Sequence, residues 1–342
     1  MKAIGYLESH PIDHPEALLD IELERPIPTG NDLLVAVRAI SVNPVDTKMR
    51  IRAAGENGRH LVLGWDAVGE VVAVGNDVTT YRVGDRVWYA GDLTRQGSNA
   101  EFQLVEEHLV GRAPNSLKDA EAAALPLTSI TAWELLFDRL KLPRKGAPGA
   151  DEPRRLLIVG AAGGVGSILV QLAKQLTDVT VIGTASRPES QAWVRELGAD
   201  HVVDHRQPLH EELKRIGIAD VTQVISLTHT EDHFDHLVEC LAPQGQLALI
   251  DDPETLLDIR KLKRKSVSLH WEFMFTRSMF QTADRGKQRA LLDEVAGLID
   301  AGTLRTTLGA LYGSINAENL RRAHRDIEQG RSIGKVVLEG FG

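Results

Sequence analysis

The chain has 342 residues, which is too long for one ordinary core and suggests about two domains. Hydrophobic residues make up 43% and charged residues 25%, a balance typical of globular proteins, and no apolar run reaches the ~18 residues that a membrane span needs. The formal net charge of −9 argues against a general nucleic-acid binder. We therefore expect neither a nucleic-acid nor a membrane partner.

Cys240 is the only cysteine in the chain. This excludes an intramolecular disulfide and any zinc site built from several cysteines. Residues 1–4 open directly into a predicted strand, with no apolar segment of the kind found in signal peptides. We expect a cytoplasmic protein in which Cys240 is a buried structural thiol.

The first hundred residues are predicted to be rich in short strands separated by Gly and Pro. The clearest strands cover residues 33–39, 68–74, 86–89 and 100–105. This pattern indicates a rolled or barrel-like sheet. Helical character begins at residue 117, and residues 141–155, rich in Pro, Gly and charge, are predicted to form an exposed loop.

Strands and helices then alternate regularly. Strands are expected at 155–160, 179–185, 200–205, 221–227, 245–251 and 266–274, and helices at 164–176, 187–198, 209–217 and 234–242. Such alternation predicts an α/β fold with a doubly wound parallel sheet covered on both faces. A helix at 287–301 and a final strand at 334–340 follow.

A glycine-rich loop joins the first of these strands to the first helix. Its glycines stand at Gly160, Gly163 and Gly166, with Gly164 and Val165 at the predicted start of the helix. Glycines at these positions permit a tight turn and a close approach of backbone to a pyrophosphate, which the N–H groups of the helix N-terminus then bind. The loop therefore predicts a Rossmann dinucleotide site.

The end of the second strand indicates which dinucleotide is bound. NAD-binding versions carry an acidic residue there, but this chain has Thr184, Ser186 and Arg187, and its first carboxylate is Glu189. A hydroxyl and a guanidinium suit the 2′-phosphate of NADP(H). An ordinary solvated position at the start of a helix is the alternative for Arg187.

Two further groups of residues are weaker candidates for sites. His229, His233 and His236 are spaced so that they could ligate a metal from one helix face, but capping and solvation explain them better. The basic run at 260–265 is best explained as a solvated helix end.

Several motifs spread over the chain carry a family resemblance. They include SVNPVDTKMR, GWDAVGEVVAVG, GAAGGVGS, ELGADHVVDH and the terminal IGKVVLEG. With them the chain resembles the medium-chain dehydrogenase/reductase superfamily, which includes zinc-type alcohol dehydrogenase-like proteins, and most closely its zinc-independent quinone oxidoreductase branch. The resemblance implies a GroES-like catalytic domain at 1–128, a Rossmann NADP-binding domain at 129–274, a return to the catalytic domain at 275–342, and a homodimer joined at the edge strand 266–274.

The resemblance also identifies candidate site residues. Zinc alcohol dehydrogenases of this superfamily hold the metal with a Cys where this chain has Asn43, and a His-Glu pair follows where it has Trp65-Asp66. Asn43 is a poor zinc ligand and Trp65 cannot ligate at all, so no metal is expected. The implied catalytic residues are Asn43, Asp46 and Trp65, with helix capping as the alternative for Asp46 and plain packing as that for Trp65. Thr131 and His205 join the expected cofactor contacts.

These features predict an NADPH-dependent, zinc-independent reductase of quinones or α,β-unsaturated carbonyls, whose partner is a small electrophilic substrate. Without a metal nothing lowers the pKa of an alcohol, whereas an electrophilic acceptor can take hydride directly. Two alternatives stay open: an alcohol dehydrogenase with an unusual metal site at the histidines, and a nucleotide-binding sensor without turnover.

Overall fold

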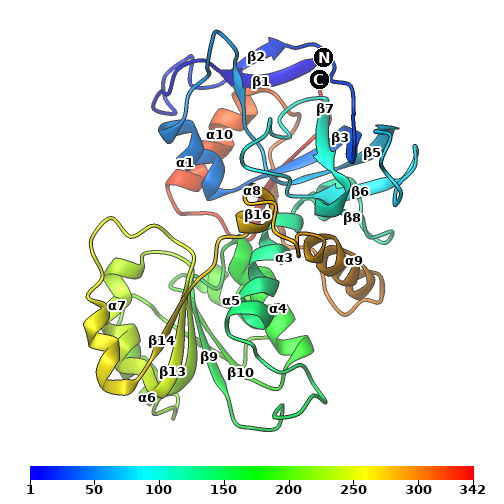
Figure 1. Ribbon diagram of the computed structural model, residues 1–342. Coiled ribbons are helices and arrows are strands. Elements are labelled where there is room, and N and C mark those ends of the chain that lie inside the picture. The colour runs from blue at the N-terminus through cyan, green and yellow to red at the C-terminus, as the bar shows by residue number, and fades with distance from the viewer. The chain divides into compact units, whose positions relative to one another are not determined.

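The computed structural model describes residues 1–342, and they divide into two compact units. One unit consists of Met1–Ile130 and Phe275–Gly342, and the other of Thr131–Met274. The two ends of the chain therefore fold into the same unit, as the blue and red ribbons in Figure 1 show. No helix combines the length and the apolar character that crossing a membrane requires.

The first unit is organised around the strand β3 (Asp32–Val42). One edge of β3 pairs antiparallel with β5 (Ala67–Val74). Its other edge pairs with β7 (Phe102–Glu106) along residues 32–36 and with β16 (Lys335–Glu339) along residues 39–42. The strand is buried along most of its length, because its residues are mainly Leu, Val, Ile and Ala and both of its edges are covered. The last strand of the chain is thereby paired with one of its first.

The remaining elements of this unit complete the rolled sheet and cover it. The other strands of the large sheet are β6 (Arg86–Tyr89), β8 (Val110–Arg112) and β15 (Leu308–Leu311), and β1 (Lys2–Tyr6), β2 (Leu19–Glu22) and β4 (Leu61–Val62) form a smaller sheet. The helices are α1 (Pro44–Arg52), α2 (Asp119–Ala123), α8 (Thr276–Met279), α9 (Lys287–Asp300) and α10 (Ala317–Glu328). The predicted β-rich domain is confirmed.

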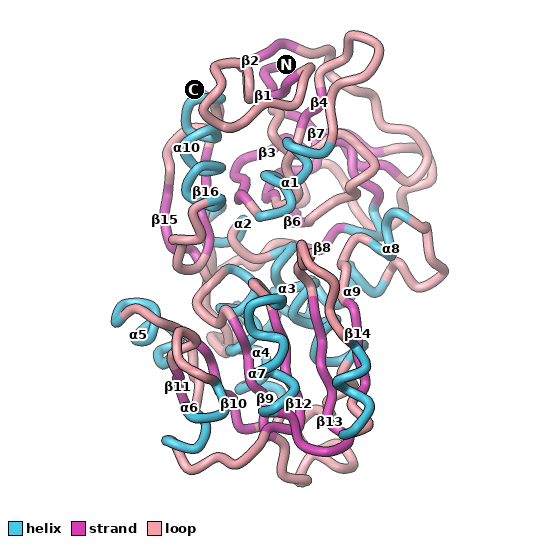
Figure 2. The backbone as a smooth tube through the Cα atoms, turned by 90° about the vertical axis from the view of Figure 1, so that its left-hand side faces the viewer, coloured by secondary structure: helices cyan, strands magenta, loops and turns pink.

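The second unit is a six-stranded parallel sheet with the order β11-β10-β9-β12-β13-β14. Its strands are β9 (Arg155–Val159), β10 (Thr180–Thr184), β11 (His201–Val203), β12 (Val221–Ser226), β13 (Leu241–Leu249) and β14 (Ser268–Trp271). This is the strand order of a doubly wound dinucleotide-binding fold, whose strand order reverses between β9 and β12. Figure 2 shows the strands side by side. The predicted fold class is confirmed.

Four α-helices connect the strands of this sheet. They are α4 (Gly164–Leu176), α5 (Pro188–Glu196), α6 (Leu209–Arg215) and α7 (Thr230–Cys240). A helix α3 (Pro126–Trp133) precedes them, and a 3₁₀ helix, η3 (Ile259–Lys265), precedes β14. The basic run lies in η3, where Lys265 donates to the carbonyls of Val238 and Glu239 at the end of α7, a favourable place for a cation.

Several expected boundaries differ from the structure, among them those of α7, β13 and β14. The helix predicted from residue 234 begins at Thr230, because Thr230 is bonded to Asp251 through its backbone N–H (2.9 Å) and its hydroxyl (2.6 Å). The strand predicted over 266–274 is limited to Ser268–Trp271. Cys240 is buried at the end of α7, and burial raises the pKa of its thiol to about 12, as expected of a structural cysteine.

The free edge of β14 predicts a self-association surface. The strand pairs only with β13, and Trp271 at its end and Phe273 just beyond it are 53% and 46% exposed. An unpaired edge with exposed aromatic side chains favours pairing with a second strand. We expect a homodimer, and Trp271→Lys should shift it to monomer because the added charge opposes burial of the edge.

Analytical ultracentrifugation of the wild-type and variant proteins checks this expectation. Phe280→Lys is the matched control, since Phe280 is 74% exposed and belongs to the first unit. A wild-type protein that sediments as a monomer at micromolar concentration would contradict the prediction.

Candidate functional site

Five polar residues meet in the interior of the first unit, and we call them the buried polar cluster: Ser41, Asn43, Asp46, Asp66 and Lys335. Each of them is at most 3% exposed. Their positions follow from the sheet, because β16 pairs with the end of β3 and so carries Lys335 next to Asn43. Asp66 directly precedes β5 on the opposite edge of β3. The fold therefore brings residues from both ends of the sequence to one point.

The Asp66 carboxylate is the acceptor at the centre of this cluster. Its Oδ2 accepts from the Ser41 hydroxyl at 2.7 Å and from the Asn43 amide at 3.1 Å, and it lies 3.2 Å from the Lys335 ammonium. Its Oδ1 accepts from the backbone N–H of Leu127 at 3.0 Å. Burial raises the pKa of Asp66, and the Lys335 charge and the three donors Ser41, Asn43 and Leu127 oppose that rise.

The Lys335 ammonium is enclosed by oxygen atoms. Besides Asp66, it donates to the carbonyl of Val42 at 3.0 Å and to the side-chain carbonyl of Asn43. Burial lowers the pKa of Lys335, while the neighbouring carboxylates of Asp66 and Asp46 act to raise it. All three hydrogens of the ammonium thus have an acceptor, as a buried cation requires.

Asp46 has a helix-capping role in the structure. Asn43 is the N-cap of α1, and its backbone N–H donates to the Asp46 carboxylate at 2.7 Å. This is the reciprocal contact of a capping box, here formed by a carboxylate at the third helical position. Desolvation raises the pKa of Asp46 to about 7, although the Asn43 N–H and the Lys335 charge both lower it. The capping alternative therefore accounts for Asp46 without any contact to a ligand.

Trp65 does not belong to the buried polar cluster, although it is the neighbour of Asp66. Its side chain is 1% exposed, its indole N–H donates to the carbonyl of Asp92 at 3.2 Å, and its ring meets that of Phe275 edge-on at 6.2 Å. These contacts are those of a packed core residue. Of the three residues expected to be catalytic, the structure thus brings Asn43 and Asp46 together and places Trp65 apart from them.

Lys335 and Ser41 are members of the cluster that the sequence does not single out, and Lys335 is the charged one. The sequence predicts the terminal strand that contains Lys335 but assigns this residue no role of its own. The available signal was a lysine directly before the apolar run at residues 336–338, a position where a charge needs a buried partner. Its partner Asp66 is far away in the sequence, so no local spacing could reveal the pair.

In the second unit, the predicted glycine loop lies between β9 and α4. Gly160 has a φ of +82°, which favours glycine, and a Cβ on Gly166 would lie 2.5 Å from the carbonyl oxygen of Gly160. Gly163 is the N-cap of α4, and since glycine has no side chain to cap it, Gly164, Val165 and Gly166 can present their N–H groups to an anion. This cradle fits the pyrophosphate of a dinucleotide.

The residues expected at the ribose end gather around the end of β10. The Thr184 hydroxyl accepts from the N–H of Gly160 at 3.1 Å and lies 3.3 Å from Nδ1 of His205. Desolvation lowers the pKa of His205, although the neighbouring Asp204 acts to raise it. Ser186 and the exposed Arg187 come next along the chain, and Arg187 is the N-cap of α5. Thr131 lies separately, buried in α3.

Arg206 was not anticipated in this group. Its guanidinium donates to the backbone carbonyl of Ser186 at 2.9 Å and binds both oxygens of Asp204, at 2.6 Å in the closest contact. The Asp204 carboxylate is therefore paired with a cation, and this contact with Arg206 lowers the pKa of Asp204. The signal in the sequence was a second arginine directly after His205 at the end of the third strand.

The histidines of α7 do not converge on one point. His229 has a left-handed backbone and is bonded to the Thr228 hydroxyl, His233 packs edge-on against His205 at 6.0 Å, and His236 packs against His210 at 6.1 Å. Because the rings belong to different contacts, the structure does not support a metal site formed by these three residues.

The raised pKa of Asp46 predicts a pH-dependent effect of Asp46→Asn. The folded-state pKa of about 7 lies above the ordinary value of 3.8, so the wild-type protein loses stability as the pH rises through this range. The asparagine keeps an oxygen acceptor for the Asn43 N–H but does not ionise. We expect the variant to gain about 1 kcal/mol or more relative to wild type between about pH 5 and about pH 8.

Urea unfolding at about pH 5 and about pH 8 measures the difference in the free energy of unfolding between the variant and wild type. Asp77→Asn serves as the control, because Asp77 is exposed. A difference between wild type and Asp46→Asn that does not change with pH would show that the carboxyl does not titrate in this range.

Comparisons with known proteins place these two units in a family. Residues 197–338 match the family model described as zinc-binding dehydrogenase, and residues 29–115 match that of the alcohol dehydrogenase GroES-like domain. A zinc-type alcohol dehydrogenase-like protein of Staphylococcus aureus strain MSSA476 is 39% identical over 99% of both chains. The crystal structure of a putative zinc-dependent alcohol dehydrogenase from Rhizobium etli is 54% identical, with a TM-score of 0.95 over 100% of this chain and 98% of that one.

A more distant solved structure is that of Escherichia coli quinone oxidoreductase complexed with NADPH. It is 25% identical, with a TM-score of 0.82 over 99% of this chain and 100% of that chain. These matches extend over both units and agree with the doubly wound sheet, the glycine loop and the rolled sheet described above. The chain belongs to the medium-chain dehydrogenase/reductase superfamily and is an oxidoreductase.

Proposed function

We propose that this protein is an NADPH-dependent, zinc-independent reductase of quinones or α,β-unsaturated carbonyl compounds. The observation that carries the proposal is the Lys335 ammonium bound by Asn43 and Asp66. By resemblance, Asn43 and the neighbours Trp65 and Asp66 stand where zinc alcohol dehydrogenases have a metal ligand and a His-Glu pair.

The donor set at these positions does not fit zinc. Zinc sites in proteins are built mainly from thiolates and imidazoles in a tetrahedral arrangement. Here Asn43 stands in the position of the thiolate, and its amide oxygen accepts a hydrogen bond from the Lys335 ammonium. The indole of Trp65 has no lone pair to offer a metal. A divalent cation beside Asp66 would also have to displace or neutralise a buried lysine. Although relatives are named zinc-type or zinc-dependent, we therefore do not assign zinc to this position of the chain.

The absence of a zinc donor set favours reduction of an electrophile over oxidation of an alcohol. Oxidation requires a group that stabilises an alkoxide, a role that zinc fulfils in metal-dependent enzymes. A quinone or a conjugated carbonyl is already electron-poor and needs orientation and desolvation more than activation. The nicotinamide cofactor, when bound, supplies the hydride. The part of this chain is to hold the pyrophosphate on the glycine loop and the ribose at the end of β10.

Preference for NADPH is supported by the charges at the ribose end. The exposed Arg187 and Arg206 both follow sheet strands there, and the carboxylate of Asp204 is paired with Arg206. A 2′-phosphate would gain charge-assisted hydrogen bonds from these guanidinium groups, whereas an unpaired carboxylate would repel it. The solved neighbour complexed with NADPH agrees with this assignment.

The proposal predicts that the purified protein oxidises NADPH in the presence of a quinone or an enone after treatment with a metal chelator. No metal takes part in the proposed reaction, so the rate should stay within experimental error of the untreated enzyme. The measurement is the loss of NADPH absorbance with a panel of quinones, enones and simple alcohols or aldehydes.

Two outcomes would overturn the proposal. Activity that is lost on chelation and restored by zinc would favour a metal-dependent dehydrogenase. Tight NADPH binding without turnover of any acceptor would favour a nucleotide-binding sensor.

The cofactor assignment predicts that Arg187→Ala raises KM for NADPH about tenfold or more and leaves KM for NADH nearly unchanged. A hydrogen bond to a charged group contributes roughly 1.5–3 kcal/mol, and each 1.4 kcal/mol corresponds to about a factor of ten. Arg206→Ala should act in the same direction and frees the Asp204 carboxylate to repel the phosphate.

Steady-state kinetics with both cofactors at fixed ionic strength checks these variants. Arg195→Ala is the matched control, since Arg195 is an exposed arginine in the last turn of α5, away from its N-terminus. Equal weakening of NADPH and NADH by Arg187→Ala and Arg206→Ala would contradict the assignment.

A further inference from the structure

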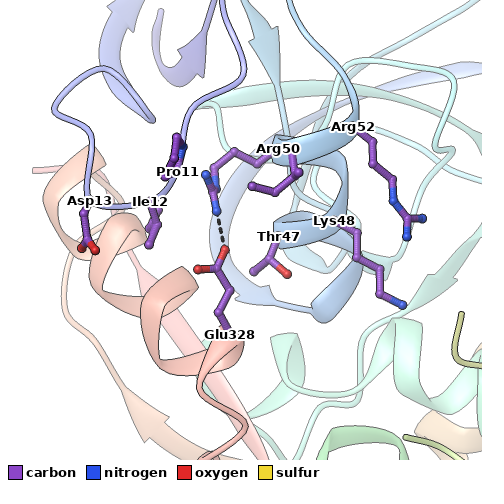
Figure 3. Close-up of a pocket in the computed structure, with 9 residues that line it drawn as sticks. Pro11, Ile12, Asp13, Thr47, Lys48, Arg50, Arg52 and Glu328 are labelled. Atoms are coloured by element: carbon purple, nitrogen blue, oxygen red, sulfur yellow. Dashed lines mark hydrogen bonds and ion pairs between the residues drawn. The ribbon is translucent and has the colours of Figure 1, made fainter. Parts of the chain in front are cut away.

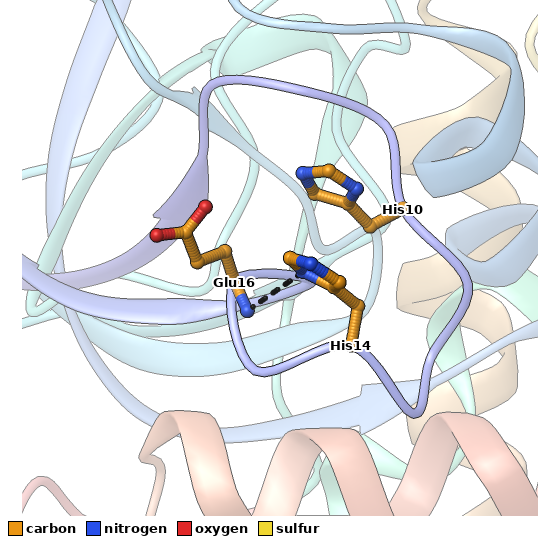
Figure 4. A group of neighbouring side chains, drawn as sticks. All are labelled: His10, His14 and Glu16. Atoms are coloured by element: carbon orange, nitrogen blue, oxygen red, sulfur yellow. Dashed lines mark hydrogen bonds between the residues drawn. The ribbon is translucent and has the colours of Figure 1, made fainter.

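A group of potential metal ligands lies in the first unit, in the loop between β1 and β2. The imidazole rings of His10 and His14 and the carboxylate of Glu16 each offer one ligand atom within 4.8 Å of the other two. The rings are stacked, with centroids 3.9 Å apart and planes 18° apart, as Figure 4 shows. Glu8 adds a second carboxylate, with an oxygen 3.9 Å from Nε2 of His10.

The backbone of this loop is held in place by contacts on both sides. The N–H of His14 donates to the carbonyl of Pro11 at 3.0 Å, and the N–H of Ala17 donates to the carbonyl of His14 at 3.1 Å. Within the loop Ile12 is 6% exposed, and Asp13 forms an ion pair with Arg325 of α10 at 2.7 Å. The main chain that carries His10, His14 and Glu16 is therefore held by contacts that do not involve an ion.

The buried side chain of Arg50 binds the main chain of this loop. Arg50 of α1 is fully buried, and its guanidinium donates to the carbonyl of His10 and binds the carboxylate of Glu328. Figure 3 shows this ion pair beside Pro11, Ile12 and Asp13, which form one wall of a surface pocket of about 460 Å³. The contact fixes the main chain at one of the two histidines, so only side-chain rotations are needed to gather the ligands.

We propose that His10, His14 and Glu16 bind a zinc-class divalent transition metal ion, with Glu8 as the fourth ligand. Ligand atoms on a tetrahedral zinc ion lie ~3.3 Å apart at bond lengths of about 2.0–2.2 Å, so separations within 4.8 Å can close by rotation of the exposed His14 and Glu16 side chains and the half-buried His10. Two imidazoles select zinc, copper or nickel over calcium and magnesium. One competing contact is the N–H of Glu16, which donates to Nδ1 of His14 at 3.2 Å.

The proposed metal site and the buried polar cluster share no residues and come from different parts of the sequence. It contains no thiolate and is partly exposed, so the ion should exchange with solvent and be removed by chelators. The proposal therefore does not depend on the proposed reaction, and metal bound here leaves the chelator test of activity unaffected.

Isothermal titration of the chelator-treated full-length protein with Zn²⁺ tests the proposal. The wild-type protein should bind one ion per chain, and His14→Ala and His10→Ala should each weaken binding about tenfold or more. His229→Ala is the matched control and should bind as wild type, because His229 lies in the second unit. Substitution of Co²⁺ for Zn²⁺ should give the visible absorption of a tetrahedral site.

The same experiment can overturn the proposal in two ways. Zn²⁺ binding that is unchanged in His14→Ala and His10→Ala would place the ion elsewhere. The absence of measurable binding to a wild-type protein that retains its folded circular dichroism spectrum would exclude the site.

Discussion

The buried ion pair between Asp66 and Lys335 is the interaction on which the first unit depends. The Asp66 carboxylate connects Ser41 and Asn43, the N–H of Leu127 and the ammonium of the last strand. Removing one member of such a pair leaves an uncompensated buried charge, which costs about 3–5 kcal/mol. The cluster can form only when β16 is paired with β3, so the interior of this unit is complete only when the end of the chain has folded.

The same pair limits the chemistry that this region can perform. A positive charge is present, but it is attached covalently to the chain and has its hydrogen bonds satisfied by Val42, Asn43 and Asp66. Unlike a metal ion, such an ammonium has no open coordination position for a substrate oxygen. This difference links a structural feature, the position of Lys335, to the proposed preference for substrates that need no Lewis acid.

The sequence was most informative where the required geometry is local. A glycine loop between a buried strand and a helix has few structural solutions, and its fold was predicted correctly from Gly160 to Gly166. The family resemblance also points to Asn43 and Asp46, and the capping alternative for Asp46 follows from its position just after Pro44. Lys335 could not be found in this way, because its partners are brought to it by strand pairing and not by spacing. The packing of Trp65 against Phe275 likewise depends on two distant segments.

The ion pairs Lys335–Asp66 and Arg206–Asp204 differ in how easily their members can change partners. Lys335 and Asp66 are both buried, so neither can leave the other without losing a compensating charge in a poorly solvated interior. Arg206 and Asp204 face solvent more openly, where an ion pair contributes little to stability and water replaces a lost contact. A guanidinium in the second situation can turn toward an arriving phosphate at small cost. The fold thus keeps a fixed charge in the interior of one unit and an adaptable charge at the nucleotide end of the other.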